Sequence, residues 1–190
     1  MTQNPNQNIR IGDVEVGPGA EPYIIAEMSG NHDGSLDKAL AIVRMAAEAG
    51  AHAVKLQTYK PETITLESDA PDFRLSEGHE LWGGRTLWDL YTEAHTPWEW
   101  HEPIFALAKE LGIHAFSSPF DPTAVDYLEN LDVPAYKIAS SEIVDLPLIR
   151  LAASKGKPII ISTGMASLGE INAAVEAARS VGNDKIVVLA

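Results

Sequence analysis

The stretch HAFSSPFDPTAVDYLENLDVPAYKIASSE, residues 114–142, contains two short apolar runs with a helical pattern between them. HAFSSPF at 114–120 and AYKIAS at 135–140 have the length and apolar character of buried strands, and DPTAVDYLENL at 121–131 has the spacing of a helix. A strand, a helix and a second strand in this order form a parallel βαβ unit. The stretch therefore predicts a parallel sheet with helices packed against it.

The same alternation continues on both sides of this unit. Further strands are predicted at 23–28, 52–58, 158–164 and 185–190, and further helices at 36–50, 103–112, 146–156 and 168–182. Five strand-then-helix units thus lead into a sixth strand.

Two architectures fit such a pattern, a doubly wound sheet and a (β/α)₈ barrel. EMSGNHDGS at 27–35 lacks the G-x-G-x-x-G turn of a Rossmann sheet. Polar residues at the carboxyl ends of nearly all predicted strands favour a barrel, in which every strand end faces one active site. We therefore expect an α/β fold, a (β/α)8 TIM barrel that is incomplete, because about six strands are present and eight are needed.

Two segments lie outside the repeating pattern. IRIGDVEVGPGAEP at 9–22 predicts a short β-hairpin that precedes the barrel and covers its bottom. Residues 59–95 are too long for an ordinary loop and rich in aromatic residues, so we expect a folded lid over the carboxyl-terminal face. For domains we expect a disordered N-terminus at 1–10 and a partial barrel at 11–190, with the remaining strands missing from the chain.

The composition excludes several classes of protein. A net charge of −13 over 190 residues argues against a nucleic-acid or anionic-membrane surface. No apolar run of about 18 residues is present, so no membrane span is expected. The chain has no cysteine and no apolar leader at its start, which makes a cytoplasmic location the expectation.

The predicted strand ends carry a set of polar side chains. Lys55 and Gln57 are two residues apart, so they share one face of their strand, while Val54 and Leu56 face the helices. Buried ammonium groups are costly without a partner. Two lysines beside seryl strand ends therefore predict a site for a phosphate or carboxylate. The other polar side chains at the predicted strand ends are Glu27, Asn31, His32, Ser117, Ser118, Ser140, Glu142, Ser162 and Thr163, and the second lysine is Lys137.

Other interpretations of these residues stay open. Glu27 and Glu142 can simply pair with the lysines. Lys137 can act as the nucleophile of a Schiff-base aldolase, or the chain can be a non-catalytic phosphate-binding fragment. No metal-ligand spacing is found among His52, His79, His95, His101 and His114, and T-P-W-E at 96–99 is a capping-box pattern with a structural role.

Five motifs in order, AEMSGNH, VKLQTY, FSSPFD, YKIASSE and IISTGMA, resemble those of the sialic acid synthase family. LWGGRTLWDLYTEAHTPWEWH at 81–101 resembles the lid of the pseudaminic acid synthases within that family. The resemblance runs from about residue 11 to the last residue. It implies a TIM barrel followed by a small antifreeze-like domain, which is absent here, and a homodimer of the full-length protein.

The resemblance also implies an activity. Phosphoenolpyruvate condenses with an amino sugar, which is a 2,4-diacetamido-2,4,6-trideoxyhexose for pseudaminic acid and an N-acetylmannosamine-type sugar for the neuraminate and legionaminate alternatives. Lys55, Ser118, Lys137, Ser140 and Ser162 would hold phosphoenolpyruvate, while Glu27, Gln57 and Glu142 would face the sugar or the reacting carbons. The family's divalent metal, Mn²⁺ or Mg²⁺, would take ligands beyond residue 190, so the fragment by itself is expected to be inactive.

Overall fold

The computed structural model describes residues 8–76, 78 and 83–189. Six strands form one parallel sheet in the order of the sequence: β3 (Ile25–Glu27), β4 (Ala53–Thr58), β5 (His114–Pro119), β6 (Tyr136–Ile138), β7 (Ile159–Ser162) and β8 (Ile186–Leu189). A doubly wound sheet would reverse its direction at a switch point, whereas consecutive order is that of a barrel wall. The prediction of a partial barrel is confirmed, and within the described residues β3 and β8 each pair with one neighbour only.

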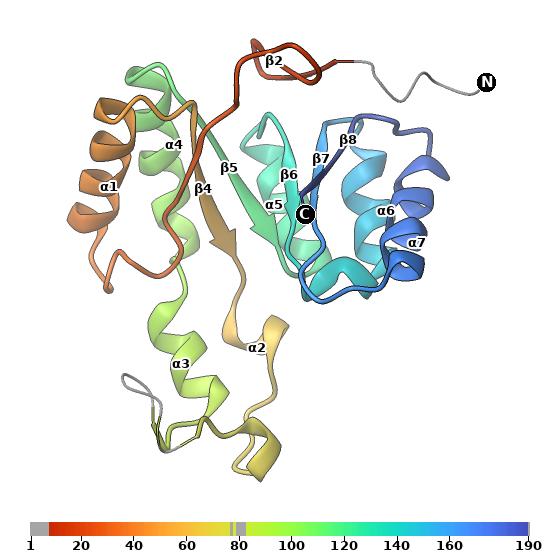
Figure 1. Ribbon diagram of the computed structural model, residues 1–190. Coiled ribbons are helices and arrows are strands. Elements are labelled where there is room, and N and C mark those ends of the chain that lie inside the picture. Colours follow the sequence, from red (N-terminus) through yellow and green to blue (C-terminus); the bar gives the residue numbers. More distant parts are fainter. Residues whose placement is uncertain (1–7, 77, 79–82, 190) are drawn as a thin grey trace.

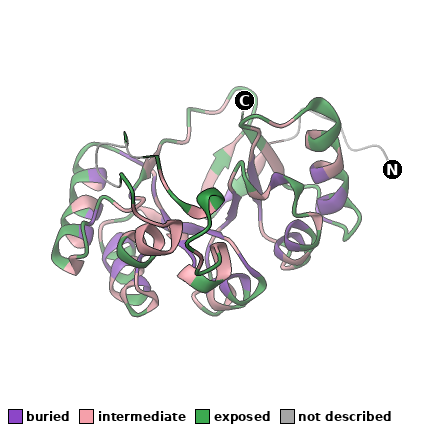
Figure 2. Ribbon diagram, turned by 90° about the horizontal axis from the view of Figure 1, so that it is seen from below, coloured by how far each residue is buried: buried purple, intermediate pink, exposed green. Residues whose placement is uncertain are grey.

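Helices line the outer side of this curled sheet. They are α1 (Leu36–Glu48), α4 (His101–Glu110), α5 (Pro122–Asn130), α6 (Leu146–Ser154) and α7 (Leu168–Arg179). Figure 2 looks along the strands and shows the helices following the sheet in an arc. Val54 and Leu56 are fully buried against Val43 of α1 and Ile104 of α4, as the strand alternation predicts. None of the helices in the described part is long and apolar enough to cross a membrane.

Side-chain caps fix most of the helix starts. Ser35 accepts a hydrogen bond at the start of α1, Asp121 caps α5, and Ser167 forms a capping box with Glu170 at the start of α7. The capping box predicted at residues 96–99 is wrong. The 3₁₀ helix η2 (Trp98–Trp100) starts after Pro97 with no side-chain cap, because the Thr96 hydroxyl instead lies 3.1 Å from Nε2 of His32.

The N-terminal hairpin covers the amino-terminal ends of the strands. β1 (Ile9–Ile11) pairs antiparallel with β2 (Val14–Val16), and Ile11 is buried in the same core as Ala53 and Phe116. Figure 1 shows the hairpin at the opposite end of the sheet from α2 and α3. The expectation of disorder over residues 1–10 is wrong for Ile9 and Arg10, because both pair with β2; residues 1–7 lie outside the described part.

His114 holds the hairpin in place. Its Nε2 atom lies 3.0 Å from Oδ1 of Asp13, and its Nδ1 atom lies 2.7 Å from the hydroxyl of Tyr23. Gly12 sits directly on the imidazole ring, with a φ of 59°. A Cβ atom at this position would lie 2.3 Å from Nε2 of His114, so the turn needs glycine both for its backbone and for its space.

The long segment between β4 and α4 is folded where the structure describes it. It contains α2 (Pro61–Ile64), the 3₁₀ turn η1 (Pro71–Phe73) and α3 (Leu87–Ala94). In Figure 1 it projects beyond the carboxyl ends of the strands on the β4 side. The Tyr59 and Tyr91 rings meet edge to face at 5.5 Å, which joins the segment to the end of β4. We call residues 59–95 the lid; its residues 77 and 79–82, Trp82 among them, lie outside the described part.

The hairpin contact predicts a large effect of one methyl group. We expect Gly12→Ala to lower the free energy of unfolding by about 1–3 kcal/mol more than Gly19→Ala, because overpacking against the His114 ring adds to the backbone penalty. Gly19 is the matched control, since it also has a positive φ, 82°, but has open space around its Cβ position. Urea denaturation measures both losses, and removing the ring with His114→Ala should abolish their difference. Equal losses in the two single variants would contradict the contact.

Candidate active site

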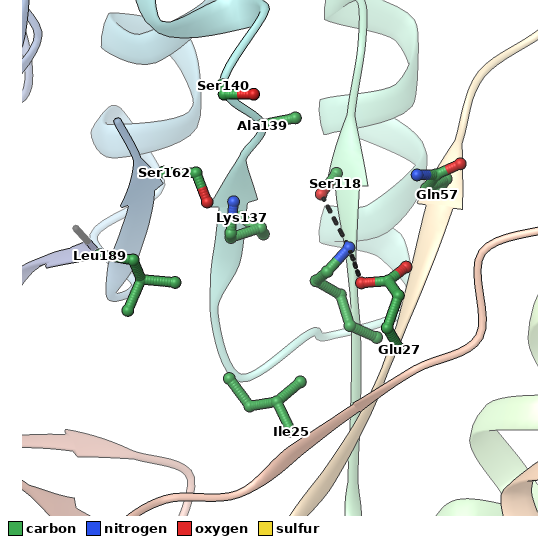
Figure 3. Close-up of a pocket in the computed structure, with 10 residues that line it drawn as sticks. Ile25, Glu27, Gln57, Ser118, Lys137, Ala139, Ser140, Ser162 and Leu189 are labelled. Carbon is green, nitrogen blue, oxygen red and sulfur yellow. Dashed lines mark hydrogen bonds and ion pairs between the residues drawn. The ribbon is translucent and has the colours of Figure 1, made fainter. Parts of the chain in front are cut away.

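A cavity of about 380 Å³ lies at the carboxyl ends of the strands. All six parallel strands or the turns that follow them contribute to its lining (Figure 3). The lining residues are Ile25, Glu27, Lys55, Gln57, Ser118, Lys137, Ala139, Ser140, Ser162 and Leu189. We call it the strand-end cavity. Seven of the eight site residues that the family resemblance implies line it, and Glu142 does not. Of the other strand-end candidates, Asn31, His32, Ser117 and Thr163 do not line it either.

Two lysines point into the strand-end cavity from β4 and β6. The ammonium of Lys55 forms an ion pair with Glu27 and lies 3.5 Å from the hydroxyl of Ser118. Lys137 is 6% exposed, and its ammonium donates to the carbonyl oxygen of its neighbour Ile138 at 2.8 Å. Burial first, and then the nearby positive charge of Lys55, lower the pKa of Lys137 to about 8, while the charges of Glu27 and Glu142 act in the opposite direction. The cavity lining therefore carries two ammonium groups and the one carboxylate of Glu27.

Glu27 is held in place from both sides of its carboxylate. Oε2 pairs with Lys55, while Oε1 accepts a hydrogen bond of 3.1 Å from the backbone N–H of Ser29. Ser29 has a φ of 48°, a region that non-glycine residues seldom occupy. The turn after β3 thus aims its N–H back at the carboxylate. Glu27 does pair with a lysine, as expected if its role were only to neutralise Lys55. Its side chain is nevertheless 42% exposed and lines the cavity.

Hydroxyl and amide groups complete the lining. Gln57 lies opposite Ser118 in the β4–β5 register, so both point to the same side of the sheet. Ser140 and Ser162 come from the ends of β6 and β7. Gly164, with a φ of 50°, lets the turn after β7 approach this group, because a Cβ there would lie 2.4 Å from that of Ser140.

Glu142 lies in the 3₁₀ turn η3 (Glu142–Val144), next to the cavity lining but not within it. Its carboxylate accepts a hydrogen bond of 2.8 Å from Ser141. Burial raises its pKa, and the charge of Lys137 acts in the opposite direction. In turn, the charge of Glu142 adds to burial in raising the pKa of Tyr91 on the lid. Glu142 thus lies between the lid and the cationic cavity.

The arrangement fits a small molecule with two anionic groups. Two ammonium groups supply charge, and three seryl hydroxyls and one amide supply directed hydrogen bonds. Within residues 8–76, 78 and 83–189, no group of three or more histidine, aspartate or glutamate side chains that could hold a metal ion is found. The chemistry that this cavity supports is the binding and orientation of an organic anion.

A buried hydrogen-bonded chain behind the cavity was missed in the sequence. The hydroxyl of Thr58 lies 2.8 Å from Nε2 of His101 and 2.6 Å from the hydroxyl of Ser117, and all three residues are 0% exposed. Burial lowers the pKa of His101 to about 4, so its imidazole is neutral near pH 7. Alternation along FSSPF places Ser117 on the helix side of the sheet. A buried hydroxyl there needs a partner, and this was the available signal.

Comparison with known proteins adds an independent line of evidence. Residues 42–190 match the profile of the NeuB family. The chain is 46% identical over 167 residues to the pseudaminic acid synthase of Campylobacter jejuni, covering 88% of this chain and 48% of that protein. It is 36% identical over 155 residues to the N,N'-diacetyllegionaminic acid synthase of Legionella pneumophila, covering 81% of this chain and 43% of that protein.

A solved structure agrees with these relatives. The crystal structure of N-acetylneuraminic acid (sialic acid) synthetase from Leptospira borgpetersenii, in complex with citrate, superposes with a TM-score of 0.82 at 27% identity, over 96% of this chain and 58% of that one. The chain therefore spans about half the length of the relatives that it matches.

The low pKa of His101 predicts a stability loss in acid. An unfolded histidine takes up its proton near pH 6.5, whereas the folded one does so only near pH 4. The contribution is fully present above pH 6.5 and is lost as the pH falls, at about 1.4 kcal/mol per pH unit. When the pH is lowered from 7 to 5, we expect the free energy of unfolding to fall by about 2 kcal/mol more in the unsubstituted protein than in the His101→Gln variant. Urea titrations at both pH values measure this, and parallel losses would contradict it.

Proposed function

The chain belongs to the NeuB family, and from this premise we propose that its strand-end cavity binds phosphoenolpyruvate as part of a pseudaminic acid synthase. The reaction would join phosphoenolpyruvate to a 2,4-diacetamido-2,4,6-trideoxyhexose and release pseudaminic acid and phosphate. Because the chain spans about half of its relatives, this activity is proposed for the complete protein. The divalent metal, the homodimer and the cytoplasmic location belong to the same proposal.

The observation that carries the proposal is the pair of lysines in one cavity. Lys55 and Lys137 both line it, and the Lys137 ammonium is buried with a backbone carbonyl as its hydrogen-bond partner. Two positive charges in one partly dry site repel each other. A ligand with a phosphate and a carboxylate relieves this repulsion and gains charge-assisted hydrogen bonds. Phosphoenolpyruvate carries both groups on a three-carbon skeleton.

The residue types also fit the proposed bond changes. The methylene carbon of phosphoenolpyruvate bonds to the aldehyde carbon of the open-chain sugar, whose oxygen takes up a proton. Positive charge then develops at the phosphate-bearing carbon, where a water molecule adds and loses its own proton. Phosphate leaves, and a 2-keto acid remains. Glu27, held by Ser29 and Lys55, is placed to stabilise that charge or to direct the water, and Gln57 lies beside it to face the sugar.

The choice of sugar is assigned to the lid. Strand-end residues serve the co-substrate that the family has in common, whereas a loop can vary on a fixed scaffold. Identity to the C. jejuni pseudaminic acid synthase, 46%, exceeds that to the L. pneumophila N,N'-diacetyllegionaminic acid synthase, 36%, which supports a pseudaminic acid synthase over a legionaminic acid synthase. An N-acetylmannosamine-type sugar is the alternative.

One observation favours a second function. A pKa of about 8 leaves a larger fraction of Lys137 unprotonated near neutral pH than an exposed lysine has, and the unprotonated amine is the nucleophile of a Schiff-base aldolase. Reduction with borohydride in the presence of a keto acid distinguishes the two functions. A stable adduct on Lys137 supports the aldolase, and its absence supports the role of Lys137 as an anion ligand.

Removing either ammonium tests the binding role of the lysines. In the complete protein, we expect Lys55→Met and Lys137→Met each to weaken phosphoenolpyruvate binding by about 2–5 kcal/mol, because each loses a charge-assisted contact in a partly buried site. Titration calorimetry measures the affinity. Lys109→Met is the matched control, since Lys109 is an exposed lysine of α4 outside the strand-end cavity. Unchanged affinity in both cavity variants would overturn the assignment.

Exchanging the lid tests the choice of sugar. In the complete protein, replacing residues 59–95 by the matching segment of an N-acetylneuraminate synthase should lower kcat/KM for the trideoxy sugar by at least about tenfold, on the scale by which pocket contacts discriminate substrates. The KM for phosphoenolpyruvate should change far less, because the strand ends are untouched. Steady-state kinetics with both sugars measures this. A retained sugar preference combined with a lost affinity for phosphoenolpyruvate would contradict the role of the lid.

A further inference from the structure

We propose that His101 is a positioning residue that acts through Thr58 and Ser117 to set the strand ends carrying Lys55, Gln57 and Ser118. This inference rests on the proposed function, because its readout is the affinity of the strand-end cavity for phosphoenolpyruvate. We call His101, Thr58 and Ser117 the hydrogen-bonded triad. None of its three residues lines the strand-end cavity.

The hydrogen-bonded triad of His101, Thr58 and Ser117 lies directly behind the residues that line the cavity. Thr58 follows Gln57 on β4, and Ser117 precedes Ser118 on β5. Each of the two hydroxyl-bearing residues is therefore adjacent in sequence to a residue that lines the cavity. Adjacent strand residues point to opposite faces, which puts Thr58 and Ser117 on the helix side. The 2.6 Å bond between their hydroxyls therefore ties β4 to β5 by side chains, one residue from the cavity.

The Thr58 hydroxyl takes part in both hydrogen bonds that link His101 to Ser117. A hydroxyl has a single proton, so Thr58, lying between Nε2 of His101 and the hydroxyl of Ser117, donates to one and accepts from the other. His101 is neutral at physiological pH and can play either part, whereas an apolar residue can play neither. Loss of His101 therefore leaves the buried Thr58 hydroxyl with Ser117 as its partner and removes the tie between the two strand ends and α4.

His101 is itself held by the segment that returns from the lid to α4. In this return segment, residues 96–101, the indole of Trp98 donates to the carbonyl of Tyr59 at 3.2 Å. The hydroxyl of Tyr127 on α5 donates to the carbonyl of Trp98 at 2.5 Å, and the two rings stack at 4.7 Å. Thr96 lies 3.1 Å from His32, in the turn after β3. The return segment thus bonds to three elements around the cavity, and His101 is its link to the strand ends.

The test compares variants that remove the hydrogen bonds between His101, Thr58 and Ser117 with one variant that keeps them. Thr58→Val keeps the shape of the side chain and removes the hydroxyl, and His101→Leu removes the ring nitrogens. In the complete protein, we expect each to raise the dissociation constant for phosphoenolpyruvate about tenfold in titration calorimetry. The dissociation constant of the double variant should be at most about twofold higher than that of the weaker-binding single variant, because both changes break the same hydrogen-bond network. His101→Gln places an amide near the position of Nε2 and should bind within about threefold of the unsubstituted chain.

A matched control separates positioning from general loss of stability. Asn183 is also buried, and its amide donates to the carbonyls of Ala153 and Lys157 at 2.9 and 2.8 Å, at the other end of the strands. Asn183→Ala should lower Tm as Thr58→Val does, yet leave the affinity for phosphoenolpyruvate unchanged.

The outcomes distinguish this inference from the function on which it rests. If Lys55→Met and Lys137→Met lose binding while Thr58→Val and His101→Leu keep it, the positioning role is overturned and the proposed function stands. A loss in Asn183→Ala equal to that in Thr58→Val also overturns it, since any destabilisation would then suffice. If the complete protein without substitutions does not bind phosphoenolpyruvate, the proposed function fails, and this inference fails with it.

Discussion

Parallel strands in consecutive order place all of their carboxyl ends at one edge of the sheet, and the rest of this molecule depends on that constraint. Residues as distant in sequence as Glu27 and Ser162 meet around one cavity only because β3 to β8 run in the same direction. The helices on the outer side bury the other face of each strand, as the full burial of Val54 and Leu56 shows. Side chains on the inner face are thereby left free to form a polar site.

Electrostatics at this edge is balanced only in part. Glu27 neutralises Lys55, but Lys137 has a backbone carbonyl as its hydrogen-bond partner and a lowered pKa caused first by burial and then by Lys55. A protein retains such an arrangement when a ligand completes it, because perturbed charges cluster at functional sites. The deficit of negative charge links the fold to the proposed co-substrate. It also accounts for the aldolase alternative, since the same burial that calls for an anion makes Lys137 more nucleophilic.

The two ends of the sheet have different tasks. At the amino-terminal end the hairpin is packed onto His114 and Ile11 is buried in the core, so this end contributes to stability. At the carboxyl-terminal end the return segment makes polar contacts to the turn after β3, to the residue that follows β4 and to α5. This division follows that of barrel enzymes generally, in which chemistry lies at the carboxyl-terminal face.

The sequence by itself determined the alternation of strands and helices, the barrel rather than the doubly wound sheet, and the strand positions of the two cavity lysines. These are local properties, because apolar periodicity and the two-residue alternation of a strand depend on neighbours along the chain. Lys55 and Gln57 share a face for this reason alone, and five short motifs were enough to indicate the family.

Only the tertiary structure decided which groups touch. His101 and Thr58 are 43 residues apart, and Thr58 and Ser117 are 59 apart, so no local pattern specifies their hydrogen bonds. For the same reason Thr96 bonds to His32 rather than capping a helix, Ile9 and Arg10 pair with β2, and Glu142 stays outside the cavity lining. Each of these outcomes depends on which partner the fold brings within hydrogen-bonding distance, a quantity that residue type and spacing do not contain.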